Sequence, residues 1–418
     1  MAATPATGLY DRFCLDRLVE ALEDTPVVAV NGARQVGKST LVTSLLSRTP
    51  VTTVVTLDDL SQREAAIEDP ASFVDRQGPL IIDEVQRVPE LLPAIKAQVD
   101  RDRRPGRFIL TGSTRLLSVP EMGASLPGRV EIVDLAPLSQ GELARRREGF
   151  VDALFAWDPA LAIRSAHTRR DYFDRLCAGG FPEPLLRHGH RRQAWFANYA
   201  TTVVERMVAD VADVQRLAVM PQLLRLCAAR TAGVLNTKDV AEDLGLPYRT
   251  VGTYLAHLQT VFLVQLLPAW SRNLTSKVSH RPKVHLADTG LAAHLIGMDP
   301  ESLPGSASAA GCLLETFVVT EVGKQLSWSN TDARPYHFRD RAGAEVDLVL
   351  EARTGRVAAV EVKASATARA SDFRGLRLLA ERLGPLFAGG VVLYSGQETV
   401  PFGERLAAVP ISALWEVL

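Results

Sequence analysis

The sequence predicts an α/β protein with a parallel sheet near its N-terminus, a helical middle and a further α/β domain near its C-terminus. Three observations lead to this fold class. Between residues 27 and 137, strand-like runs alternate with helical patterns, which is typical of a parallel sheet with helices on both faces. From residue 142 to residue 230 the apolar spacing is helical. Residues 345–350 and 357–363 then alternate like two strands joined by a turn.

A glycine-bounded loop follows the first of four predicted strands, which are Val27–Val30, Val51–Leu57, Leu80–Ile82 and Phe108–Leu110. Residues 91–99 predict an amphipathic helix between the last two strands. The loop has the glycine, lysine and serine spacing of a phosphate-binding loop, and a helical run follows it. The predicted nucleotide-binding residues are Gly32, Ala33, Arg34, Gln35, Val36, Gly37, Lys38, Ser39 and Thr40.

The residue types in this loop predict binding of ATP with Mg²⁺. Gly32 and Gly37 allow backbone N–H groups to turn toward phosphate oxygens. Lys38 brings a positive charge to the β- and γ-phosphates, and Ser39 offers a hydroxyl to Mg²⁺. A turn could match the spacing by chance, but the preceding strand and the following helix favour the nucleotide.

The third predicted strand ends in two carboxylates, Asp83 and Glu84. Ligands bind beyond the carboxyl ends of parallel strands, so we expect both beside the loop. Asp83 is predicted to hold Mg²⁺, and Glu84 to polarise the attacking water as a general base. The fourth strand leads into Thr111 and Ser113, whose hydroxyls are expected to face the γ-phosphate or the water.

Arg129 follows a glycine turn and is a candidate arginine finger that would act on the site of a neighbouring subunit. This interpretation predicts a homo-oligomer. An ordinary surface arginine is the alternative.

The middle of the chain predicts a helix-turn-helix. Residues 237–244 and 248–258 have apolar residues at helical spacing around a Gly245-Leu246-Pro247 turn. Longer helices are predicted over residues 195–211 and 219–229. Strand-like runs at 261–267 and 283–286 flank a basic loop, so the whole resembles a winged helix. DNA contact and a purely structural role both remain open. The side chains expected to face DNA are Tyr248, Arg249, Thr250 and Thr253, with Arg272, Asn273, Lys277, His280 and Arg281 in the loop.

The last two strand-like runs predict a hairpin centred on Thr354, which places Asp347 opposite Glu361 and Glu345 opposite Lys363. Like charges that face each other across a ladder are destabilising, and a divalent cation between them is the simplest reason for them. Strict alternation would put Val346, Leu348 and Leu350 on the other face. Residues 304–311 are small and aperiodic, and predict a linker ahead of this domain.

Bulk properties limit the remaining choices. The 418-residue chain is expected to contain several domains, with boundaries at 1–140, 141–235, 236–303 and 304–418. Its net charge is −1, so a nucleic-acid surface would require local clustering of cations. The four cysteines form no CxxC pair, which disfavours zinc and disulfides. No signal peptide or bilayer-spanning run is visible, so a cytoplasmic protein without a membrane partner is expected.

The motifs resemble the AAA-type ATPase domain of a prokaryotic family that pairs it with a C-terminal domain of unknown function. This resemblance implies ATP binding and hydrolysis in an oligomer. The motifs that carry it span nearly the whole chain, at residues 32–39, 81–89, 110–113, 126–129, 136–139, 179–182 and 286–291.

The C-terminal hairpin resembles the PD-(D/E)XK nuclease core. Asp347, Glu361 and Lys363 stand at its signature positions, and Glu315 matches an acid often found on the preceding helix. The resemblance implies that the three carboxylates hold Mg²⁺ or Mn²⁺ and that Lys363 positions the nucleophilic water. Val346 stands where the pattern has proline. Cleavage of nucleic acid is one interpretation, and a switch or scaffold that binds a protein or DNA without cutting is the other.

Overall fold

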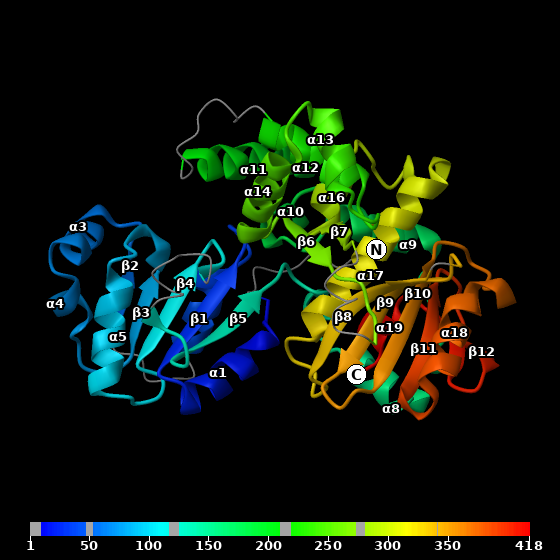
Figure 1. The fold of residues 1–418 in the computed structure, drawn as a ribbon, viewed down its shortest axis with the longest axis horizontal. Coiled ribbons are helices and arrows are strands. Elements are labelled where there is room, and N and C mark those ends of the chain that lie inside the picture. Colours follow the sequence, from blue (N-terminus) through cyan, green and yellow to red (C-terminus); the bar gives the residue numbers. More distant parts are fainter. Residues whose placement is uncertain (1–9, 47–52, 117–124, 210–218, 273–280, 341) are drawn as a thin grey trace. The chain divides into compact units, whose positions relative to one another are not determined.

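The computed structural model describes residues 10–46, 53–116, 125–209, 219–272, 281–340 and 342–418. The chain divides into two compact units, one of Met1–Pro137 with Thr260–Phe262, and the other of Leu138–Gln259 with Leu263–Leu418. Both contain a sheet covered by helices, which confirms the predicted α/β fold class (Figure 1). The four domain boundaries drawn from the sequence remain predictions.

The first unit is built on a parallel sheet with strand order β2-β3-β4-β1-β5. All four predicted strands are present, although residues 51 and 52 lie outside the described part. The edge strand β5 was not predicted, because its charged residues interrupt the apolar run. The bounds are β1 Val27–Gly32, β2 Thr53–Thr56, β3 Leu80–Asp83, β4 Phe108–Gly112 and β5 Val130–Leu135.

Helices cover this sheet because their apolar faces need a partner. The predicted helix at 91–99 is confirmed as α5, whose Leu92, Ile95 and Val99 are buried in one core with Val27 and Ala29 of β1. The other helix that bears on the site is α2, which begins directly after the loop. The helices are α1 Cys14–Asp24, α2 Lys38–Leu46, α3 Leu60–Glu68, α4 Pro70–Val74 and α5 Leu91–Arg101.

The second unit begins with helices and then forms the predicted helix-turn-helix. Gly245 ends the first helix of this motif in the left-handed region, at φ +62°, where glycine carries no steric cost. An antiparallel pair of strands, β6 and β7, follows. The helices are α7 Gln140–Ala144, α8 Phe150–Ala156, α9 Arg169–Ala178, α10 Pro182–Leu185, α11 Gly189–Ala209, α12 Val219–Ala229, α13 Thr237–Leu244, α14 Tyr248–Thr260 and α16 Thr289–Leu295, and the strands are β6 Val264–Leu267 and β7 Lys283–Leu286.

The predicted strand at 261–267 is shorter than expected, because Phe262 adopts φ +61° in a turn before β6. Of the predicted basic loop, Arg272 and Arg281 are described. Asn273, Lys277 and His280 lie outside the described residues.

The C-terminal sheet has the order β12-β13-β11-β10-β9-β8. Strands β9 and β10 form the predicted hairpin, and the pair Val360 with Leu348 confirms a register centred on Thr354. The elements are α17 Ala307–Gln325, β8 Ala333–Arg339, β9 Glu345–Ala352, β10 Val357–Lys363, α18 Arg374–Leu383, β11 Phe387–Tyr394, β12 Val400–Gly403, β13 Leu406–Pro410 and α19 Ala413–Glu416.

Two expectations for this region are wrong. Residues 304–311 are neither a linker nor a mobile loop. A 3-10 turn spans Leu303–Gly305, and α17 begins at Ala307, where three alanines of the segment favour a helix. Strict alternation also fails in β9. Phe338 pairs with Val346 and Tyr336 with Val349, so β9 contains one extra residue. This bulge puts Val346 and Val349, rather than Val346 and Leu348, into one core.

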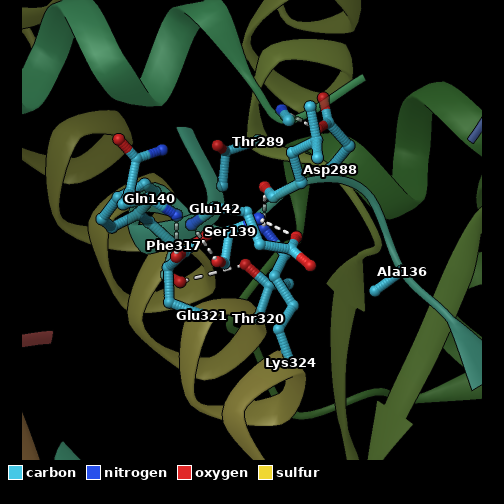
Figure 2. Close-up of polar contacts among 12 residues, drawn as sticks. Ala136, Ser139, Gln140, Glu142, Asp288, Thr289, Phe317, Thr320, Glu321 and Lys324 are labelled. Atoms are coloured by element: carbon cyan, nitrogen blue, oxygen red, sulfur yellow. Dashed lines mark hydrogen bonds and ion pairs between the residues drawn. The ribbon is translucent and has the colours of Figure 1, made fainter. Parts of the chain in front are cut away.

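A buried polar network fastens the segment that follows β5 to α17 (Figure 2). The Lys324 ammonium donates to the Leu138 carbonyl at 3.0 Å and to Glu321 at 2.5 Å. The other oxygen of Glu321 accepts from the Gln140 amide at 2.8 Å. Leu138 also donates to Gly180 O, and the Gly180 amide donates to Asp288. Three motifs that carry the family resemblance, at residues 136–139, 179–182 and 286–291, thus contact one another.

None of the helices in the described part of the chain combines the length and apolarity needed to span a bilayer.

Candidate functional site

The predicted phosphate-binding loop lies between the carboxyl end of β1 and the first turn of α2. Gln35 and Gly37 have positive φ angles of 60° and 102°, which turn the backbone of the loop. A Cβ on Gly32 would lie 2.5 Å from the Leu135 carbonyl oxygen, so this position requires glycine. The loop therefore has the geometry that brings backbone amides and a helix N-terminus to one place.

Lys38 is buried against the loop, with 6% of its surface exposed. Its ammonium donates to the carbonyl oxygens of Gly32 at 3.0 Å and Ala33 at 3.1 Å. It also lies 4.0 Å from Glu84 Oε1. Burial lowers the pKa of Lys38, while Glu84 and Asp83 act in the opposite direction. The lysine is thus held over the loop beside two carboxylates, where a phosphate would be the stronger partner.

Asp83 and Glu84 meet Thr111 and Ser113 because β3 and β4 are neighbours in the sheet. The Thr111 hydroxyl donates to Asp83 and accepts from the Glu84 amide at 3.1 Å. The Ser113 hydroxyl donates to Glu84 Oε2 at 2.9 Å. Glu84 itself has φ 57°, in the left-handed region. These contacts orient both carboxylates, and the same elements that were expected to converge do so.

Two side chains near the site were not anticipated from the sequence. Gln86 Nε2 donates to Glu84 Oε2 at 2.5 Å and to Ser113 Oγ at 3.0 Å. Arg12 donates to the Val36 carbonyl in the loop at 3.0 Å and to the Ala136 carbonyl after β5 at 2.6 Å. Gln86 lies within the motif at residues 81–89 but was assigned no role from the sequence, and Arg12 precedes the whole sheet and belongs to no motif.

Arg129 lies near the amino ends of the strands, whereas the loop of its own chain lies at their carboxyl ends. It precedes β5, which runs parallel to β1 with Val130 beside Val27, whereas the loop follows β1. Its guanidinium pairs with Asp100 at 2.7 Å. Arg129 therefore does not reach its own nucleotide site, and its role in the site of a neighbouring subunit remains a prediction.

The C-terminal signature residues lie together. Lys363 Nζ is 2.6 Å from Glu361 Oε1. Asp347 Oδ2 accepts from the Val362 amide at 3.0 Å, beside the last paired residues of the hairpin. Glu361 Oε2 is buried and has no hydrogen-bond partner among the described residues. Burial, reinforced by Asp347, raises the pKa of Glu361 to about 8.

A lysine that the sequence did not single out stands among these carboxylates. Lys283 is the first residue of β7 and is 2% exposed. Its Nζ lies 2.7 Å from Glu315 Oε1, 3.0 Å from Glu345 Oε1 and 3.1 Å from Asp347 Oδ1. Burial opposes its charge, but Asp347, Glu315 and Glu345 outweigh it and hold the pKa of Lys283 above its ordinary value.

The two metal sites inferred from the sequence differ in how well the residues fit an ion. Ser39 and Asp83 supply the hydroxyl and carboxylate oxygens that Mg²⁺ prefers, and Thr111 orients the Asp83 carboxylate. In the C-terminal cluster, the ammonium of Lys283 already occupies the space between Glu315, Glu345 and Asp347. Across the described residues, no three His, Cys, Asp or Glu side chains are arranged to hold a metal ion. The cluster as arranged does not fit a second Mg²⁺ or Mn²⁺.

Three parts of the chain are similar to known protein families. Residues 24–144 match the family model of an AAA domain. This range contains the loop at residues 32–39 and the carboxylates at the end of β3. Residues 169–302 and 310–414 match two separate domains of unknown function (DUF8612 and DUF4143).

Two mycobacterial proteins are similar along most of this chain. The uncharacterized proteins Mb2031c of Mycobacterium bovis and Rv2008c of Mycobacterium tuberculosis are each 28% identical over 397 residues, which is 94% of this chain and 82% of the relative.

Solved structures are more distant. The Walker-type ATPase PABY2304 of Pyrococcus abyssi is 16% identical with a TM-score of 0.40, over 71% of this chain and 98% of that one. The RuvB Holliday junction branch migration motor of Thermotoga maritima is 18% identical with a TM-score of 0.27, over 61% of this chain and 89% of that one.

Proposed function

We propose that the protein hydrolyses ATP in a Mg²⁺-dependent reaction at the Gly32–Ser39 loop. The observation that carries this proposal is the convergence of the loop lysine and two oriented carboxylates, with Lys38 Nζ 4.0 Å from Glu84 Oε1. A loop that only bound nucleotide would not need a carboxylate positioned to accept a proton from water.

Each residue has a distinct role in the proposed reaction. Lys38 exchanges its two carbonyl partners for the β- and γ-phosphates, which are stronger acceptors because they are charged. Ser39 and Asp83 would hold Mg²⁺, which neutralises charge on the phosphates. Glu84 polarises the attacking water, and Ser113 and Gln86 orient its Oε2. Phosphoryl transfer requires mainly such positioning and charge stabilisation.

Replacing Lys38 tests the nucleotide site. Lys38→Ala removes the positive charge that is held over the loop for the β- and γ-phosphates, so we expect nucleotide affinity to fall by about 10-fold or more. Lys96→Ala, which removes a lysine from α5, is the matched control and should bind normally. Unchanged binding of a fluorescent ATP analogue by Lys38→Ala would remove the loop from the proposal.

We further propose that the helix-turn-helix region binds nucleic acid. A hollow of about 390 Å³ lies between α13, α14 and β6, and Lys238, Tyr248 and Arg281 contribute to its lining. Tyr248 is 51% exposed at the start of α14, next to the exposed Arg249. An exposed aromatic ring among cations suits stacking on a base with contacts to phosphates.

Binding to labelled DNA and RNA at two salt concentrations tests this surface. Lys238→Ala/Arg249→Ala should weaken binding and reduce its salt dependence, since fewer phosphates are neutralised. Arg353→Ala removes an 89% exposed arginine elsewhere and serves as control. If wild-type protein binds neither nucleic acid at low salt, the surface instead serves contacts with a protein.

Arg129 is proposed to complete the site of a neighbouring subunit in a homo-oligomer. Its partner Asp100 would have to release it. Arg129→Ala and Glu84→Gln should each be inactive, but their mixture should regain turnover, because Glu84→Gln subunits supply arginines to intact Glu84 sites. A mixture as inactive as its components would oppose this role.

For the C-terminal domain we favour binding without cleavage over a metal-dependent nuclease. The gathering of Asp347, Glu361 and Lys363 favours a nuclease-like fold, but Lys283 stands where the ion would be needed. We expect no cleavage of DNA or RNA with Mg²⁺ or Mn²⁺, with or without ATP. Cleavage by the wild type that disappears in Asp347→Ala would restore the nuclease proposal.

A further inference from the structure

We propose that Lys283 permanently replaces a divalent cation in the C-terminal carboxylate cluster and makes it a metal-independent clasp. The clasp joins β7, which carries Lys283, to α17 and β9, which carry the carboxylates. This inference concerns a site separate from the nucleotide loop and does not depend on ATP turnover.

The geometry around Lys283 matches the bonding capacity of an ammonium. A lysine has three N–H donors and no acceptor. Three carboxylate oxygens, from Glu315, Glu345 and Asp347, lie 2.7, 3.0 and 3.1 Å from its nitrogen. Glu315 and Asp347 accept hydrogen bonds from the ammonium, and Glu345 forms an ion pair with it. A divalent cation needs oxygens at about 2.0–2.6 Å, so it cannot share this space with the ammonium.

The backbone of Lys283 is also held in place, because it is paired on both sides. Residue 283 pairs with Leu267 across the β6–β7 ladder and bridges to Val234 on its other side. The neighbouring Pro282 carbonyl accepts from the Leu235 amide at 2.8 Å. With 2% of the residue exposed, the side chain can leave the cluster only if this backbone moves as well. The ammonium is consequently a built-in part of the cluster.

The other charged side chains of the cluster are also consistent with a cluster that holds no metal. The fourth carboxylate, Glu361, has its own partner in Lys363 at 2.6 Å. Burial, with Asp347 adding to it, raises the pKa of Glu315 well above its usual range. The carboxylates are thus held together without a metal.

Mn²⁺ binding to the nucleotide-free full-length protein, measured by electron paramagnetic resonance, tests the proposal. We expect wild type and Asp347→Asn to bind the same amount. Lys283→Ala should gain one site, because it leaves the carboxylates facing a vacated space, and Lys283→Ala/Asp347→Asn should lose it again. Mn²⁺ should also raise the Tm of Lys283→Ala by at least about 2 °C, and leave that of wild type unchanged.

Lys324→Ala is the matched control, because it also removes a buried lysine, but one that forms an ion pair with a single carboxylate, Glu321, among the described residues. It should gain no Mn²⁺ site. The proposal is overturned if wild type binds Mn²⁺ at a site that Asp347→Asn abolishes, or if folded Lys283→Ala gains no site. Should Lys283→Ala fail to fold, the comparison of wild type with Asp347→Asn decides alone. Either failure would leave the ATPase proposal intact, since ATP turnover is measured separately.

Discussion

Glu148 has a buried carboxyl group that accepts a hydrogen bond from a backbone amide and has a raised pKa. The Gly141 amide donates to its Oε1 at 2.6 Å, and a Cβ on residue 141 would lie 2.0 Å from the Glu148 Cδ. Burial, with Glu321 adding to it, raises the pKa of Glu148 from 4.5 to about 7. The folded protein therefore holds this proton more tightly than the unfolded chain does.

This shift predicts a pH dependence of stability. Because the folded-state pKa is raised, the stability that Glu148 contributes is complete below pH 4.5 and is lost as pH rises toward 7. Over that interval, the free energy of unfolding of wild type should fall relative to Glu148→Gln by on the order of 2 to 3 kcal/mol. Urea unfolding of both proteins across this range measures the difference. Parallel pH profiles would contradict the account of Glu148.

Gly32 shows how a single residue limits the nucleotide loop. Gly32→Ala would place a methyl group 2.5 Å from the Leu135 carbonyl oxygen of the neighbouring strand. We expect the loop to shift and nucleotide affinity to fall at least about 10-fold. Gly252→Ala is a suitable control, because a Cβ there meets no atom within 4 Å. Normal nucleotide binding by Gly32→Ala would show that the loop accommodates the change.

At the scale of elements, α17 anchors the segment that follows β5 (Figure 2). Lys324→Met would leave Glu321 buried, 1% exposed, without its counter-charge. We expect a loss of about 3–5 kcal/mol in stability, because an uncompensated buried charge is costly. Lys324→Met/Glu321→Gln should recover part of this loss, since the amide oxygen still accepts from Gln140. Thermal unfolding measures the stability of each variant. If the losses caused by the two single substitutions simply add in the double variant, the result would argue against the pairing of Lys324 with Glu321.

Elements with strong periodicity could be predicted from the sequence almost to the residue, as α12, α13 and the hairpin of β9 and β10 illustrate. The segment at 304–311 was misjudged, because small residues fit both a linker and a helix until packing decides. The edge strand β5 lacks a continuous apolar run and gave no such signal.

The residues of the candidate sites also differ in whether they could be predicted from the sequence. Lys38, Asp83 and Glu84 could be predicted because a motif places each directly after a strand. Lys283 could not, because it reaches Glu315 and Asp347 from 32 and 64 residues away along the chain. No local pattern reports such a contact. The bulge in β9 was equally invisible, since it depends on the pairing with β8.

At the scale of the whole molecule, the two compact units should unfold as separable transitions in calorimetry. MgATP analogues bind only the first unit in this account. They should therefore raise the Tm of one transition, and Lys38→Ala should abolish that rise. A single transition that nucleotide shifts as a whole would show that the units unfold together.

The central claim is that Glu84 converts a nucleotide-binding loop into a hydrolytic site. Phosphate release at saturating MgATP, measured for wild type, Glu84→Gln and the exposed control Glu90→Gln, tests it most directly. We predict that Glu84→Gln binds nucleotide within about 2-fold of wild type but loses turnover by about 100-fold or more, since general-base contributions are of that size. Glu90→Gln should turn over normally. Wild-type turnover by Glu84→Gln would contradict the claim.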